Sequence, residues 1–137
     1  GHGLLTGAFT AATTFDTARD WRGNGVAFGQ PIFRGDNFRT NVGVVERIRR
    51  EVSEPRGVTV SQIALAWVLG HPAVSTALVG ARTPAEVDAN DGGVELELSP
   101  GERKTIEGIL AGVAGRVREF TPLRPAMQPW GEEIPAE

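Results

Sequence analysis

The residue that offers the clearest chemistry is Arg82, which stands between a glycine turn and a predicted helix start. The apolar run 77–79 ends at Gly80, and Thr83 followed by Pro84 is typical of an N-cap and a first helical position. A helix start presents backbone N–H groups and the positive end of the helix dipole, so the pattern indicates a phosphate site. The same pattern is common in α/β proteins, and a purely structural role for the arginine remains the alternative.

Two strands and a short helix are expected to position this turn. The unbroken apolar stretch within residues 75–79 predicts a buried parallel strand, and a vestige of a second strand is expected at Leu4–Thr6. The helix that follows the turn is expected to run over residues 84–90. A further helix is expected after a cap at Thr59, and its run 63–69 is apolar on every side, which predicts that it is covered all round, with Trp67 in the core.

Two amphipathic helices complete the predicted elements. The first begins at Asp36 or Asn37 and ends at the Pro-Arg-Gly sequence 55–57, and its charged residues 46, 47 and 49–51 are expected on the solvated side. The second begins with a capping box at Ser99 and is predicted to span about eighteen residues.

Composition excludes several classes of function. The chain has 137 residues, a formal net charge of −3 and no cysteine, so no nucleic-acid partner, disulfide or cysteine-based metal site is predicted. No apolar run has the length of a membrane span, and a cytoplasmic location is the default expectation. His2 and His71 lack neighbouring partners in sequence, so no metal site is predicted. One domain is expected over residues 1–120, followed by a tail over 121–137.

Residues 78–90 resemble the cofactor-binding segment of the aldo-keto reductase family. The resemblance implies an α/β fold, the (β/α)8 barrel, of which this chain would be a C-terminal fragment that is mostly helical with one or two short strands. It also implies NADP(H) as the cofactor, with the adenosine 2′-phosphate and adenine held after the last strand. The cofactor-binding residues implied in this segment are Gly80, Ala81, Arg82, Glu86 and Asn90.

Two features of this segment depart from the family pattern. Ala89 stands where a glutamate usually precedes the asparagine, and Ala81 offers only a backbone N–H where many members have a hydroxyl. Both departures loosen the expected hold on adenosine, and they leave the preference for NADPH over NADH open.

The first residues of the chain resemble a second family segment, the glycine-rich loop after the seventh barrel strand. By that resemblance Gly1, His2 and Gly3 cover the cofactor pyrophosphate. Arg22 lies in an Asp-Trp-Arg triplet that recurs in the loop folded over the cofactor, and it is a candidate for reaching the pyrophosphate, with a solvated surface arginine as the alternative. Ala8 stands where the family often has a lysine.

The resemblance implies an oxidoreductase that reduces aldehydes or ketones, its partners being the nicotinamide cofactor and a small carbonyl substrate. The family's catalytic Asp, Tyr, Lys and His belong to the first half of the barrel, and this chain contains no Tyr. No catalytic residue is therefore assigned, and the piece alone is predicted to be inactive and to self-associate. Trp130 in the tail is a candidate for facing the substrate. The alternative is a non-enzymatic helical module that binds a protein partner through the arginine-rich helix face.

Overall fold

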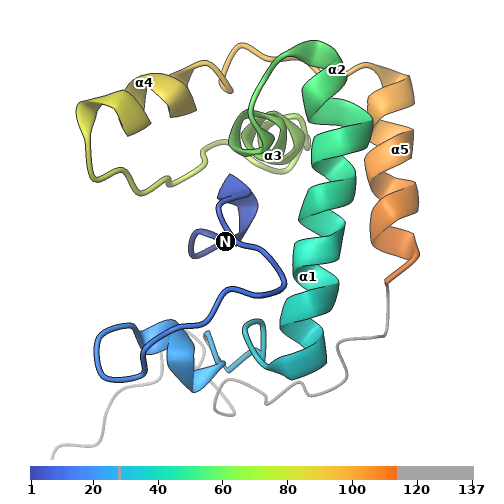
Figure 1. Ribbon diagram of the computed structural model, residues 1–137. Coiled ribbons are helices and arrows are strands. Elements are labelled where there is room, and N and C mark those ends of the chain that lie inside the picture. Colours follow the sequence, from blue (N-terminus) through green and yellow to red (C-terminus); the bar gives the residue numbers. More distant parts are fainter. Residues whose placement is uncertain (28, 114–137) are drawn as a thin grey trace, which may run out of the picture.

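The computed structural model describes residues 1–27 and 29–113, and these residues form helices and turns joined by irregular stretches (Figure 1). The longest helix, α1, packs against α5, while α3 contacts the N-terminal 3-10 turn η1 and the helix α4. The elements are η1 (Leu4–Thr6), η2 (Trp21–Asn24), α1 (Gly35–Ile48), the π turn η3 (Arg49–Ser53), α2 (Glu54–Arg56), α3 (Val60–Leu69), α4 (Pro84–Asp91) and α5 (Pro100–Ala111).

Helix α1 carries one apolar stripe, as its sequence predicts. Phe38, Val42, Val45 and Ile48 recur at helical spacing, and all four are buried in the core. The helix begins at Gly35, one residue before the predicted start. Its stripe faces the core that α3 and α5 complete.

The C-terminal end of α1 widens into the π turn η3 before α2 closes at the glycine predicted to end it. Pro55 has no N–H to donate to the preceding turn, which favours a local change of helical pitch. Gly57 then adopts a left-handed φ of 65°, the usual helix stop. Arg49 was predicted on the solvated face, but the structure places it half-buried. Its Nη2 donates a 2.5 Å hydrogen bond to the carbonyl of Gly7.

Helix α3 begins at the capping box formed by Thr59 and Gln62, whose side chains each bond the other's backbone N–H. Val60, Ile63 and Ala66 are buried, and Trp67 packs half-buried against the core. The expectation that this helix is covered all round is wrong for the described residues, because Val68 is 37% exposed. The other residues of the helix are buried or half-buried.

Helix α5 confirms the predicted capping box. The Ser99 hydroxyl accepts from the Glu102 N–H, and the Glu102 carboxylate accepts from the Ser99 N–H at 2.7 Å. Ile106 and Ile109 enter the core. The helix has 12 residues and ends at Ala111, with Gly112 at its C-cap, so the predicted length of about eighteen residues is wrong. Trp130 and the tail 121–137 lie outside the described residues.

Both predicted strands are absent from the described residues. Residues 75–79 form irregular chain, and Leu4–Thr6 form the 3-10 turn η1 between two glycines with left-handed φ values, Gly3 and Gly7. A strand requires a neighbouring strand for its ladder of hydrogen bonds, and within residues 1–27 and 29–113 the sole bridge is the isolated pair Ala27 and Gln30. The apolar run therefore lies exposed, with Leu78 at 98%.

Membrane insertion through a helix finds no support in this part of the chain. Each helix within the described residues is too short or too polar to cross a bilayer.

Candidate functional site

The turn at residues 80–82, here called the 80–82 turn, leads directly into α4. Thr83 caps the helix by accepting a 3.2 Å hydrogen bond from the N–H of Glu86, and Pro84 occupies the first helical position. The predicted helix over 84–90 is confirmed, with one more residue at its end, Asp91. Local capping signals are sufficient to place this helix start.

The Glu86 carboxylate occupies the N-terminal end of α4. It accepts a 2.7 Å hydrogen bond from the backbone N–H of Arg82. It also forms an ion pair with the Arg82 guanidinium, whose Nη2 donates to Glu86 Oε1 at 3.0 Å. These contacts hold the pKa of Glu86 below its usual value, the backbone hydrogen bond being the largest cause. The Arg82 side chain remains 89% exposed, so its charge is available to a ligand that competes with Glu86.

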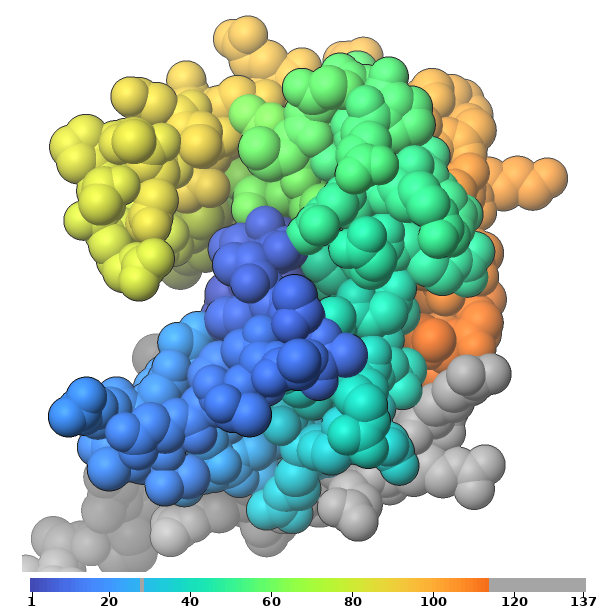
Figure 2. Space-filling model, viewed as in Figure 1, coloured from blue at the N-terminus to red at the C-terminus, as the bar shows by residue number. Residues whose placement is uncertain are grey.

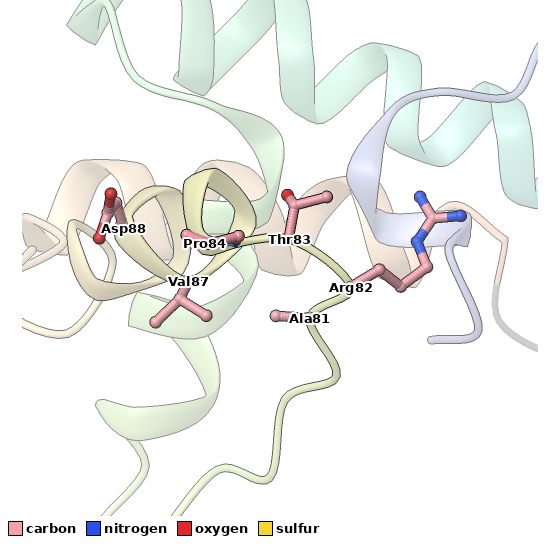
Figure 3. Close-up of a pocket in the computed structure, with 6 residues that line it drawn as sticks. All are labelled: Ala81, Arg82, Thr83, Pro84, Val87 and Asp88. Atoms are coloured by element: carbon pink, nitrogen blue, oxygen red, sulfur yellow. The ribbon is translucent and has the colours of Figure 1, made fainter.

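A shallow, open hollow of about 460 Å³ lies over the start of α4 (Figure 3). Two of the predicted cofactor residues, Ala81 and Arg82, help to line it, and the rest of the lining comes from Thr83 and from Pro84, Val87 and Asp88 of α4. Gly80 precedes these residues on exposed chain, and Asn90 lies one helical turn beyond Glu86, half-buried. The five residues predicted for adenosine binding therefore gather on this turn and on α4.

The N-terminal loop, residues 1–3, is a tight turn with left-handed backbone at two consecutive positions. His2 has a φ of 52° and Gly3 a φ of 85°, and the Leu4 N–H donates to the Gly1 carbonyl at 2.8 Å. The His2 ring meets the Trp21 ring edge-on, with the centroids 5.2 Å apart. A non-glycine residue is uncommon in this backbone region, so contacts around the loop must hold His2 there.

Arg22 lies beneath the N-terminal loop rather than on the surface. Its Nε donates to Asp20 Oδ1 at 2.8 Å, its Nη1 donates to the His2 carbonyl at 3.2 Å, and its side chain is 27% exposed. The guanidinium carbon lies 5.1 and 5.0 Å from the ring centroids of Phe9 and Phe15. The alternative of a solvated surface arginine is therefore wrong, and the loop and Arg22 are brought together as one unit.

The Arg22–Asp20 pair shifts the pKa of both groups. The hydrogen-bonded guanidinium lowers the pKa of the Asp20 carboxyl, and the carboxylate raises that of Arg22. Both groups stay charged at neutral pH, so the pair contributes no net charge to the loop above it.

Helix α3 connects the two predicted parts of the site. Its Gln62 side chain donates to the Ala89 carbonyl of α4 at 3.0 Å, and its Ser61 hydroxyl lies 3.5 Å from the Leu5 carbonyl in η1. Figure 2 shows an open notch between the N-terminal segment and the segment that carries α4. Segments about eighty residues apart in sequence thus border the same opening.

Sequence reasoning missed the residues that hold Arg22 in place. Asp20 stands in the Asp-Trp-Arg triplet, but its role as carboxylate partner was not predicted. Nothing in the spacing of Phe9 and Phe15 indicates that a guanidinium lies over their two adjacent rings. Within residues 1–27 and 29–113, no group of three His, Asp or Glu side chains is arranged to hold a metal ion.

Comparison with known proteins identifies the family. The model of the aldo/keto reductase family matches residues 1–111, which is most of the chain. The chain belongs to the aldo/keto reductase family, a family of oxidoreductases built on a (β/α)8 barrel.

Three curated relatives are similar over part of their length. Aldo-keto reductase YhdN of Bacillus subtilis is 29% identical over 108 residues, which are 79% of this chain and 31% of that protein. A Schizosaccharomyces pombe protein that carries the name of a voltage-gated potassium channel beta subunit is 38% identical over 87 residues, 62% of this chain and 23% of its own. Versiconal hemiacetal acetate reductase of Aspergillus parasiticus is 26% identical over 76 residues, 56% of this chain and 22% of that enzyme. The chain thus spans less than a third of each relative.

Proposed function

We propose that this chain is the NADP(H)-binding part of an aldo-keto reductase that reduces aldehydes or ketones by hydride transfer. The observation that carries the proposal is the 89% exposed guanidinium of Arg82 at the capped start of α4, within the segment that resembles the family's adenosine site. An exposed cation beside a helix N-terminus favours a phosphate group. Small carbonyl substrates and a cytoplasmic location belong to the same proposal.

The two parts of the site divide the cofactor between them in this proposal. The 80–82 turn takes the adenosine 2′-phosphate, and Glu86 and Asn90 lie along the adenine. The N-terminal loop, residues 1–3, takes the pyrophosphate on the other side of the notch in Figure 2. When bound, the cofactor supplies the hydride, and the residues of this chain bind and orient it.

Glu86 weakens anion binding in the proposed site. Its carboxylate already accepts from the Arg82 backbone and side chain, so a phosphate must displace it or bind beside a like charge. Repulsion between like charges opposes both arrangements. We therefore expect a modest affinity for NADPH, which Glu86→Gln increases.

The chain itself carries no catalytic acid in this proposal. It contains no Tyr, and Lys104, its sole lysine, is exposed on α5. Proton donation to a carbonyl needs a positioned acid within hydrogen-bond reach. We expect no NADPH oxidation above the buffer rate when this chain is mixed with a panel of aldehydes.

The charges on α1 and η3 do not favour the alternative function, a module that binds a protein partner. Arg47 and Arg50 pair with Glu51, while Arg49 pairs with Glu46 and bonds the Gly7 carbonyl. These pairs offset the positive face that the module would present to an acidic partner.

The test is Arg82→Ala, measured by titrating NADPH and NADH against the chain in a calorimeter. Loss of a charge-assisted hydrogen bond is expected to weaken NADPH binding by roughly tenfold to a hundredfold. NADH binding should change little because NADH lacks the 2′-phosphate. The matched control is Arg39→Ala, which removes a 60% exposed arginine paired with Asp36 far from the turn in sequence. Equal losses for both cofactors, or no binding by the unaltered chain, would contradict the proposal.

A further inference from the structure

We infer that Arg22 is a positioning residue for the pyrophosphate loop and does not itself bind the cofactor phosphates. The inference rests on the proposed function, since it assigns the N-terminal loop, residues 1–3, to the pyrophosphate of NADP(H). It differs from the sequence prediction, in which the Arg22 charge reaches the pyrophosphate directly.

The hydrogen-bonding capacity of the Arg22 guanidinium is largely used within the chain. The Asp20 carboxylate accepts hydrogen bonds from Nε and Nη2 of Arg22, with an Nη2–Oδ2 distance of 2.5 Å. Nη1 donates to the His2 carbonyl. Phe9 and Phe15 lie close to the guanidinium, with both ring centroids within 5.1 Å. A phosphate that used this cation would have to break the bidentate pair, which is among the stronger polar contacts in proteins.

The guanidinium also contacts the loop backbone and fits against its glycine. A Cβ placed on Gly3 would lie 3.1 Å from Arg22 Nη1 and 3.2 Å from the end of the Phe9 ring. Gly3 also has a φ of 85°, which other residues rarely adopt. The N-terminal loop therefore packs directly against the side chains of Arg22 and Phe9.

The contacts from Arg22 and its neighbour Trp21 also explain the unusual backbone conformation of His2. Its φ of 52° lies in the left-handed region, where a non-glycine residue needs support from its surroundings. The Nη1 bond fixes the His2 carbonyl, and Trp21, next to Arg22, meets the His2 ring. Residues of η2 and its N-cap Asp20 therefore determine the orientation of the peptide groups in the N-terminal loop.

The inference is tested with Arg22→Gln and Asp20→Asn in the full chain, using two probes in a calorimeter. NADPH carries a pyrophosphate, whereas 2′-phosphoadenosine carries the 2′-phosphate alone. Both variants are expected to weaken NADPH binding by about tenfold, because a small misplacement of a binding group has a large effect on ligand interactions. Binding of 2′-phosphoadenosine should stay within about twofold, since the energetic coupling between separate, independent sites is small.

Asp20→Asn separates the positioning role from direct phosphate binding. If Arg22 bound phosphate itself, removal of its carboxylate partner would free the cation and tighten NADPH binding, the opposite of the expected sign. Arg22→Lys sharpens the test, because it keeps the charge but loses the bidentate fork, and we expect it to behave like Arg22→Gln. The amide resonances of His2 and Gly3 should shift in all three variants, and the control Arg39→Gln should leave them unchanged.

Each outcome decides a separate question. Tighter binding by Asp20→Asn, unchanged NADPH binding by Arg22→Gln, or equal losses for the two probes would overturn the positioning role while leaving the proposed function standing. Failure of the unaltered chain to bind either probe would instead overturn the proposed function, and the positioning role with it.

Discussion

Helices α3 and α4 begin in the same way and differ in what they bury. Thr59 and Thr83 each accept a 3.2 Å hydrogen bond from the N–H three residues later. Helix α3 then buries Val60, Ile63 and Ala66, whereas α4 has no buried residue. The comparison shows that capping alone specifies where a helix starts, while burial decides how much that helix contributes to the stability of the fold.

The largest expected effect is loss of the α3 core. Ile63 is 1% exposed, so Ile63→Ala should lower the free energy of unfolding by about 2–5 kcal/mol. The matched change on α4 is Val87→Ala, where the side chain is 54% exposed and the expected change stays within about 0.5 kcal/mol. Urea denaturation followed by circular dichroism measures both. Similar losses for the two variants would show that α4 is packed as firmly as α3.

The second effect concerns the exposed apolar chain between the two helices. Leu78 is 98% exposed, and unpaired apolar segments of this kind tend to associate. We expect the average mass measured by analytical ultracentrifugation to rise with protein concentration, and Leu78→Lys to reduce that rise. A monomer at all concentrations would contradict the predicted self-association.

The third effect compares the caps themselves. Thr59→Ala should lower the global free energy of unfolding by about 1 kcal/mol, the usual cost of losing an N-cap. Thr83→Ala should lower the free energy of local opening of α4 by a similar amount. It should leave the global unfolding transition nearly unchanged, because local and global opening are then separate events. Hydrogen exchange of the two helices distinguishes these outcomes, and a matching global loss for both variants would be evidence against the distinction.

The smallest effect is a pH dependence confined to the start of α4. The Arg82 contacts lower the pKa of Glu86 below its ordinary value of 4.5, so the folded state holds fewer protons than the unfolded state there. The contribution of Glu86 to helix stability is therefore present above pH 4.5 and is lost as the pH falls through the lowered pKa. An NMR titration should show the α4 amides shifting with the Glu86 carboxyl, and Glu86→Gln should abolish that dependence. A Glu86 carboxyl that titrates at its ordinary value would contradict the prediction.

The sequence predicts the helices of this molecule well, because their signals are local. The caps at Thr59, Thr83 and Ser99 and the stripe on α1 are all confirmed. The apolar run 75–79 shows the limit of such signals, since a strand depends on partners elsewhere and none pairs with it among the described residues.

The candidate site divides along the same line. The position of Arg82 follows from the cap beside it, and both the turn and the helix start are where the sequence predicts them. The position of the Arg22 guanidinium over the neighbouring rings of Phe9 and Phe15 depends on how the chain from Phe9 to Phe15 folds back on itself. No periodic pattern in that stretch reports such a contact.

The π turn at Arg49–Ser53 has a consequence for changes of chain length. A π turn holds more residues than the α turn it replaces, so it can absorb or release a single residue without moving the helix on either side. Ser53 holds the far end of this turn through a 2.5 Å hydrogen bond from its hydroxyl to the Val58 carbonyl. We therefore expect the stretch between α1 and Gly57 to tolerate a one-residue insertion or deletion better than the regular α-helical turns of α1.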